Sequence, residues 1–226
     1  MNLSDGDQEI TIAGQRLLLL PERAVFWEAQ STVLIADPHF GKSATFRASG
    51  IPVPSGTTAD AVERLKTIVR RTKTTRIIFL GDFLHAREGR SKQMLDELLT
   101  WRESCRDLGL LLVRGNHDRH AGDPPGELGV ECVNGPYELD PFVLTHHPRR
   151  FDSGYSLAGH VHPAVRLSGR GRQHLRLPCF LFGDTGAILP AFGDFTGYAD
   201  VEPVPGDQIF AVTDSGAIRI NHPVQD

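Results

Sequence analysis

Three short apolar segments, each ending abruptly in a polar motif, constrain the fold of this chain more than any other feature. Residues 32–36, 76–80 and 110–113 have the length and composition of buried strands. The motifs at which they stop are Asp37-Pro38-His39, Gly81-Asp82 and Gly115-Asn116-His117-Asp118.

Helical patterns separate the three strand-like segments. The stretch after the first strand, as far as Gly56, is expected to be a loop rich in glycine and proline. A helix then opens at Thr57, where Asp60 three residues later resembles a capping box, and a second helix spans residues 91–107. Apolar residues recur at helical spacing in both: Val62, Leu65, Ile68 and Val69, then Met94, Leu95, Leu98, Leu99 and Cys105. Two successive β-helix-β units predict a mostly parallel sheet with helices on its faces.

The remainder of the chain has β-like patterns. Apolar runs at residues 10–12, 17–20 and 24–27 are separated by turn signals, and residues 208–212 and 217–220 are expected to form a closing hairpin. Other strand-like segments follow Gly122, at residues 129–133, 142–145, 156–159, 164–167, 175–182 and 187–189. Since the chain contains no linker, repeat or low-complexity tract, we expect a single α/β domain over residues 1–226 with a second, β-rich sheet.

Charge and cysteine content narrow the class of protein. The formal net charge of −4 argues against a generic polyanion binder, and three cysteines without a CxxC pair indicate neither a zinc knuckle nor a disulfide framework. No apolar run approaches the ~18 residues that a membrane span needs, and the acidic N-terminus is no secretory signal, so we expect a cytoplasmic protein without membrane association. The average charge hides a basic stretch between Pro141 and Phe180, where one acid, Asp152, accompanies six arginines: Arg149, Arg150, Arg166, Arg170, Arg172 and Arg176. This stretch allows a local anion-binding face.

Histidines gather at the ends of the expected strands. Eight of the ten histidines fall between His39 and His162, and two further strand-like segments stop at His146-His147 and at Gly159-His160-Val161-His162. A lone histidine at a strand end is more often a turn former or a cap, but an ordered set is not explained in that way. Because the carboxyl ends of strands in open α/β sheets converge on one rim, we expect a mixed nitrogen and oxygen site suited to Mn²⁺, Fe or Zn²⁺.

The order of these motifs resembles the calcineurin-like metallophosphoesterase superfamily, and more closely its branch of ligase-associated DNA damage response endonucleases. The resemblance covers nearly the whole chain. It is carried by Ala36-Asp37-Pro38-His39-Phe40-Gly41-Lys42, Ala44-Thr45-Phe46-Arg47-Ala48, Gly50-Ile51-Pro52-Val53-Pro54, Gly81-Asp82-Phe83-Leu84-His85-Ala86, Leu177-Pro178-Cys179-Phe180 and Leu189-Pro190-Ala191-Phe192-Gly193. The last of these stretches and the arginine-rich Gly169-Arg170-Gly171-Arg172 point to the branch.

The resemblance implies a fold and a set of site residues. The fold would be an α/β sandwich of two mixed β-sheets flanked by helices, with the active site at the carboxyl-terminal rim of the strands. Two divalent cations would share Asp82, one held by Asp37, His39, Asp82 and His162, and the other by Asp82, Asn116, His146 and His160. His117 would lie over the scissile phosphate. His147 is the alternative to His146, which we favour because it is nearer the strand end. His85 stands where many members have Asp, so its role stays open.

These residue types suit the hydrolysis of a phosphate ester. Two cations roughly 3.5–4 Å apart generate a bridging hydroxide, neutralise phosphate oxygens and clamp an in-line displacement. Mixed Asp, His and Asn ligation favours Mn²⁺ over Mg²⁺ or Ca²⁺. A protonated His117 would donate to the departing oxygen as a general acid. Asp118 is either an orienting partner of the ligands or the start of a turn.

Three other interpretations fit the chain less well. Residues 36–43 match a loose P-loop, but Pro38 offers no N–H to a phosphate, and His39 and Phe40 crowd the loop. The stretch around Ser156 lacks the final glycine of a nucleophile elbow. A non-catalytic scaffold would lack a metal ligand, and none is missing.

The substrate is predicted less directly than the chemistry. The branch resemblance and the arginines favour a DNA phosphodiester, with Arg170 and Arg172 contacting phosphates beside the scissile one. A small-molecule or lipid-linked phosphate ester is the alternative. The branch also implies a role in DNA repair and functional association with a DNA ligase and a repair helicase.

Overall fold

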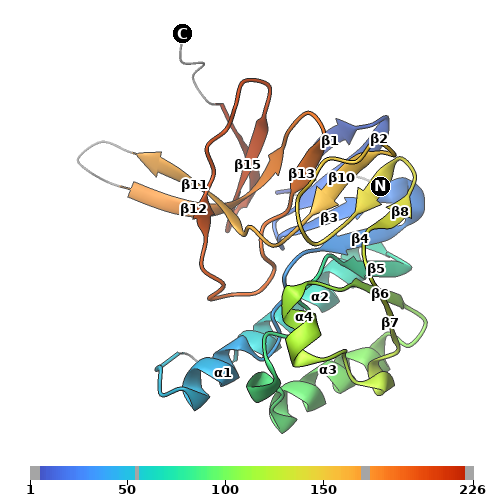
Figure 1. Ribbon diagram of the computed structural model, residues 1–226, viewed down its shortest axis with the longest axis vertical. Coiled ribbons are helices and arrows are strands. Elements are labelled where there is room, and N and C mark those ends of the chain that lie inside the picture. The colour runs from blue at the N-terminus through green and yellow to red at the C-terminus, as the bar shows by residue number, and fades with distance from the viewer. Residues whose placement is uncertain (1–5, 54–55, 169–173, 222–226) are drawn as a thin grey trace.

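Two β-sheets pack face to face, and helices cover the outer face of one of them (Figure 1). The computed structural model describes residues 6–53, 56–168 and 174–221. Both sheets contain parallel and antiparallel pairs, so the expected sandwich of two mixed sheets is confirmed.

The first sheet has seven strands in chain order. Its first four strands form antiparallel pairs, whereas β4 to β7 pair in parallel, so the carboxyl ends of β4, β5 and β6 reach the same edge. The strands are β1 (Gln8–Ile12), β2 (Gln15–Leu20), β3 (Ala24–Trp27), β4 (Thr32–Ile35), β5 (Arg76–Phe79), β6 (Gly109–Val113) and β7 (Val130–Val133).

The second sheet has the order β14-β11-β12-β13-β10-β9-β8, and β15 pairs with β12 and with β16. Its strands are β8 (Tyr137–Leu139), β9 (Phe142–Leu144), β10 (Tyr155–Ala158), β11 (Pro163–Ser168), β12 (His174–Phe182), β13 (Gly186–Ile188), β14 (Ala199–Asp200), β15 (Gln208–Thr213) and β16 (Gly216–Ile220). The β15–β16 hairpin is the closing hairpin expected from the sequence.

Successive side chains along each strand of the first sheet point to opposite faces of the sheet. The two faces therefore contribute to two different hydrophobic cores. Val33, Ile35 and Phe79 pack with the helices, whereas Leu34 and Ile78 pack with the second sheet. The helices are α1 (Lys42–Ala48), α2 (Thr57–Thr72), α3 (Lys92–Ser104) and α4 (Asn116–Ala121), with 3₁₀ turns η1 (Glu28–Gln30), η2 (Arg87–Gly89) and η3 (Gly126–Leu128). Within the described residues, none of these helices is long and apolar enough to cross a bilayer.

Several local predictions differ from the structure. The predicted capping box is wrong, because α2 has Gly56 as its N-cap and no side-chain cap bond, and Thr57 Oγ1 instead lies 2.6 Å from Ser43 Oγ. The expected loop after β4 contains α1, and the Gly-Asn-His-Asp motif opens α4. Both helices are too short to be stable alone, so their sequences carry little signal.

Candidate metal centre

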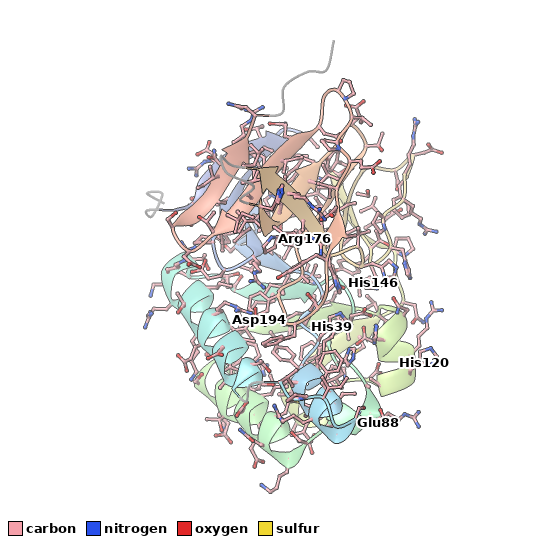
Figure 2. All side chains as sticks on the ribbon, turned by 90° about the vertical axis from the view of Figure 1, so that its left-hand side faces the viewer. His39, Glu88, His120, His146, Arg176 and Asp194 are labelled. Atoms are coloured by element: carbon pink, nitrogen blue, oxygen red, sulfur yellow. The ribbon has the colours of Figure 1, made fainter. Side chains whose placement is uncertain are left out.

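All seven predicted metal ligands lie at one rim between the two sheets. Asp37 follows β4, Asp82 follows β5, and Asn116 opens α4 directly after β6. The second sheet contributes His146 beyond β9 and the His160-Val161-His162 turn beyond β10. Figure 2 shows His39 and His146 close together near the middle of the molecule.

The first predicted group converges on the imidazole of His39. Its Nε2 lies 3.3 Å from His162 Nε2 and 3.8 Å from Asp82 Oδ2. His162 Nε2 is in turn 3.8 Å from Asp37 Oδ2. The ligand atoms of Asp37, His39 and His162 all lie within 4.8 Å of one another, a spacing that one cation can span.

The second predicted group converges on His146 Nε2. This atom lies 2.8 Å from Asn116 Oδ1, 3.1 Å from His160 Nδ1 and 3.5 Å from Asp82 Oδ1. Asp82 thus turns one carboxylate oxygen to each group, Oδ2 to His39 and Oδ1 to His146. This is the arrangement required of a bridging ligand.

Backbone carbonyls fix the orientation of two imidazoles. Nδ1 of His146 donates to Leu80 O at 2.9 Å, and Nδ1 of His162 donates to Thr196 O at 3.1 Å. With the proton on Nδ1, the Nε2 lone pair of each ring is directed into the centre. His146 is buried, whereas His147 is exposed with its ring centroid 4.1 Å from that of His160. The geometry therefore favours His146 as the ligand over His147 at the rim.

The electrostatics of the centre suit divalent cations. Asp37 Oδ1 is buried and has no hydrogen-bond partner, and burial together with the Asp82 carboxylate raises the pKa of Asp37 well above its usual value. Burial also lowers the pKa of His146 and of His162 to about 4, so both imidazoles are neutral near pH 7. The Asp37 carboxylate, with one oxygen that has no partner among the described residues, and the neutral imidazoles beside it form a donor set that a divalent cation would complete.

Comparison with solved structures assigns the family. The chain matches the crystal structure of Pseudomonas putida nuclease MPE with a TM-score of 0.83 and 38% sequence identity, over 95% of this chain and 100% of that one. The chain belongs to the metallophosphoesterase family of this nuclease. A second match, the E. coli phosphoesterase Yfce, covers 84% of this chain and 97% of that one at 13% identity and a TM-score of 0.40, too weak a likeness to bear on function. No protein-family model matches the chain, and no curated protein matches it.

The chain is therefore a metal-dependent phosphoesterase. The P-loop alternative is excluded by this assignment. Ser156, considered above as a nucleophile, lies buried within β10, where a Cβ on Gly186 would approach its Oγ to 2.0 Å. This is the environment of a packed strand residue.

The glycines of the metallophosphoesterase motifs give the ligands room. A Cβ on Gly81 would lie 2.1 Å from His146 Nδ1, and a Cβ on Gly115 would lie 2.2 Å from Asp82 Oδ1. Gly81 also has φ of +88°, which glycine adopts readily. These positions accept only glycine because the side chains of other strand ends pass directly over them.

Backbone strain is concentrated at the same rim. Ten described residues other than glycine have positive φ, and half of them are predicted ligands: Asp37, His39, Asp82, His160 and His162. Strained residues of this kind persist where the surrounding structure holds them, and they cluster at functional sites.

Asp118 orients the ligand loops. Its buried carboxylate accepts the backbone N–H groups of Gly115 and Asp82, both at 2.8 Å, and that of Phe83 at 2.9 Å. Of the two alternatives that the sequence left open, the structure supports the orienting one. The motif spacing alone did not reveal this role, because two of the three N–H donors, those of Asp82 and Phe83, come from a different strand end.

His85 lies beside the centre, and its ring nitrogen lies within 4.8 Å of those of His39 and His117. Its Nδ1 is 3.5 Å from His39 Nδ1, its ring stacks on His117 at 4.9 Å, and its carbonyl accepts from His117 Nδ1 at 2.7 Å. Burial lowers the pKa of His85 to about 4. The position that departs from the superfamily pattern therefore contacts two predicted site residues.

The arginines of the basic stretch do not form one uniform patch. Arg166 and Arg176 both form ion pairs with Asp200 of β14, a residue outside the sequence window in which the charges were counted. Arg170 and Arg172 lie outside the described residues. The positive charge available to an anion is therefore smaller than the sequence suggests.

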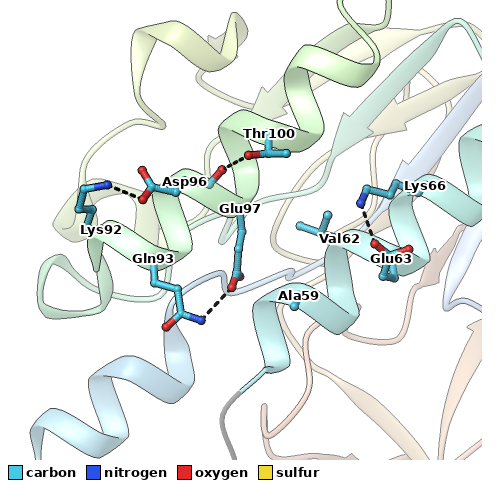
Figure 3. Close-up of a pocket in the computed structure, with 9 residues that line it drawn as sticks. All are labelled: Ala59, Val62, Glu63, Lys66, Lys92, Gln93, Asp96, Glu97 and Thr100. Carbon is cyan, nitrogen blue, oxygen red and sulfur yellow. Dashed lines mark hydrogen bonds and ion pairs between the residues drawn. The ribbon is translucent and has the colours of Figure 1, made fainter.

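A hollow of about 500 Å³ between α2 and α3 lies away from this rim (Figure 3). Its polar side chains bond one another, as Lys66 does with Glu63, Lys92 with Asp96, and Gln93 with Glu97. These side chains are therefore bonded to one another along α2 and along α3, on the two sides of the hollow.

Proposed function

We propose that this metallophosphoesterase is a DNA endonuclease that works with two divalent cations, with Mn²⁺ preferred. The 38% identity to Pseudomonas putida nuclease MPE, which extends over 95% of the chain, carries the proposal. The mixed carboxylate, imidazole and amide donors support the choice of Mn²⁺, since Mg²⁺ and Ca²⁺ prefer oxygen ligands.

The predicted ligands would form two groups, each holding one cation. Asp37, His39, Asp82 and His162 would hold one cation, and Asp82, Asn116, His146 and His160 the other. When bound, the cations would supply Lewis-acid charge that neutralises phosphate oxygens and lowers the pKa of a water.

His117 would act at the leaving group. Its Nδ1 donates to His85 O at 2.7 Å, and its Nε2 lies 3.9 Å from Asp82 Oδ2, so Nε2 is turned toward the centre. As an imidazolium it would donate the Nε2 proton to the departing sugar oxygen. The carbonyl of His85 would hold the ring in place while the proton moves.

Arg170 and Arg172 would contact phosphates that flank the scissile one. We further propose a role in DNA repair beside a DNA ligase and a repair helicase. This part of the proposal is supported only by the motif resemblance.

A plasmid-nicking assay tests the function. The metal-free protein is expected to be inactive and to be restored best by Mn²⁺ among Mn²⁺, Mg²⁺, Zn²⁺ and Ca²⁺. Asp82→Ala should lose more activity than any other ligand variant, because it removes a ligand from both cations. His120→Ala, an exposed histidine on α4 outside both ligand groups, is the matched control. Full nicking by the chelated protein would overturn the proposal, and hydrolysis of small phosphodiesters without nicking would favour the alternative substrate.

A further inference from the structure

Phe195 combines two features that rarely occur together in a bulky apolar residue. Its φ is +58°, and the residue is 46% exposed. Positive φ is a true outlier for a bulky residue, because the Cβ crowds the backbone. Burial does not compensate for this strain, since Phe195 is an exposed residue.

The residues on either side of Phe195 are held tightly. Asp194 accepts from Arg23 and from Arg64, at 3.0 Å each, and Arg64 also donates to Phe192 O. Thr196 is buried. The loop is therefore fixed around Phe195, and the exposed ring is not the consequence of a loosely attached segment.

The same loop is joined to the metal centre. Gly193 N donates to Asp37 O at 3.1 Å, and Thr196 O accepts from Nδ1 of His162 at 3.1 Å. Phe195 is thus adjacent to a residue that orients a predicted ligand. A substrate whose scissile phosphate lies at the cations would place its neighbouring groups next to this loop.

We propose that Phe195 is a stacking platform for an unpaired nucleobase of the substrate, next to the scissile phosphate. An aromatic ring binds any base through its π face, and the interaction requires a base that is free of its partner strand. A phenylalanine side chain has only two χ angles, so it loses little conformational entropy when a base stacks on it. The inference rests on the proposed nuclease function and adds a base-binding subsite to it.

The contact with the base can be measured by comparing two substrates that have the same phosphates, one with bases and one without. The kcat/KM for an oligothymidylate is compared with that for an abasic chain of equal length, both in Mn²⁺. Phe195→Ala is expected to lower the ratio of the two values by about five- to 150-fold, which corresponds to ~1–3 kcal/mol, chiefly through KM on the oligothymidylate. Phe195→Tyr and Phe195→Trp should keep the ratio, whereas Phe195→Leu, apolar but without a π face, should behave like Phe195→Ala.

Ile218→Ala is the matched control, because Ile218 is 48% exposed on β16, outside the loop that holds Phe195. Its ratio of the two kcat/KM values should equal that of the wild type.

An unchanged ratio in Phe195→Ala would overturn the stacking role. Equal losses on both substrates would also overturn it, since they would indicate an effect on His162 through Thr196. If the wild-type protein cleaves neither strand, the proposed function fails and the subsite fails with it. If the wild-type protein cleaves the strands but Phe195→Ala has the same ratio of kcat/KM values as the wild type, only the base-binding subsite is contradicted and the nuclease function stands.

Discussion

The carboxylate of Asp118 accepts the backbone N–H of Asp82 at 2.8 Å, so an acid on α4 fixes the loop that carries the predicted bridging ligand. The same carboxylate accepts from Gly115, beside Asn116, and from Phe83. One side chain therefore sets the spacing between the ends of β5 and β6.

Asp118→Ala is expected to lower the free energy of unfolding by about 3 kcal/mol or more, because it leaves buried N–H groups without an acceptor. Metal affinity should fall as well. Urea unfolding of the metal-free protein measures the first effect, and metal titration the second. Asp123→Ala removes a partly exposed acid paired with Arg114, and it should cost about 1 kcal/mol or less. Wild-type stability in Asp118→Asn would contradict the need for a carboxylate.

The neighbouring histidines His146 and His147 are expected to differ sharply on substitution. His146→Ala should lose metal and activity together, because its Nε2 lies 2.8 Å from Asn116 Oδ1 and 3.5 Å from Asp82 Oδ1. His147→Ala should keep both, since His147 is exposed at the rim. Metal content of the purified variants decides the point, and loss of metal from His147→Ala would reverse the assignment.

The position of the predicted ligands at one rim could be expected from the sequence, because it depends on the order of the motifs and on the strand ends. Asp37, Asp82 and Asn116 follow three parallel strands whose apolar sequences are clear, and parallel strands bring their carboxyl ends to one edge. The position of a histidine at a strand end can be predicted from the local sequence, without information about distant packing. The grouping of these residues at one rim could therefore be predicted from the sequence, whereas their roles as ligands remain a prediction.

The remaining features depend on contacts between distant segments. Asp118 binds N–H groups across 35 or 36 positions of sequence, and Asp200 reaches Arg166 across 34. The positive φ of Phe195 follows from a loop that Arg23 and Arg64 hold from other elements. No local pattern encodes such contacts, and for the same reason α1 and α4 escaped prediction.

Metal affinity is expected to rise with pH, with protons released on binding. The raised pKa of Asp37 means that the metal-free site retains protons at a pH where an ordinary aspartate is charged. A cation must displace these protons, so falling pH weakens binding. His146 and His162, with pKa values of about 4, are already neutral at higher pH and release none.

Calorimetric titration with Mn²⁺ in two buffers of different ionisation enthalpy counts the released protons. Asp37→Asn should release fewer protons than the wild type. Affinity that does not change between mildly acidic and neutral pH would contradict the protonated carboxylates.

His117→Ala should impair DNA cleavage far more than hydrolysis of an activated aryl phosphodiester. A sugar alkoxide leaves poorly without a proton, whereas a nitrophenolate leaves readily without one. General acid catalysis typically contributes about 10²- to 10⁴-fold, so the DNA rate should fall within that range at unchanged metal content. Steady-state rates on both substrates test this, and equal losses would replace proton donation by a role in positioning.

Arg170 and Arg172 provide the last test, because they were assigned to the substrate from sequence and lie outside the described residues. If both arginines contact phosphates, the double alanine variant should bind DNA more weakly than the wild type. The slope of log K against log salt should also become shallower, by about the amount that two phosphate contacts contribute. Lys66→Ala combined with Lys92→Ala removes the same charge from α2 and α3, where both lysines are ion-paired. That control should alter the slope little, since a change in overall charge acts weakly at a distance in salt.

Binding measured by fluorescence anisotropy across a salt series, without turnover, gives the slopes of both variants. Equal slopes for the arginine variant and the wild type would place these arginines away from the DNA and leave Arg149 and Arg150 as the remaining unassigned arginines of the basic stretch.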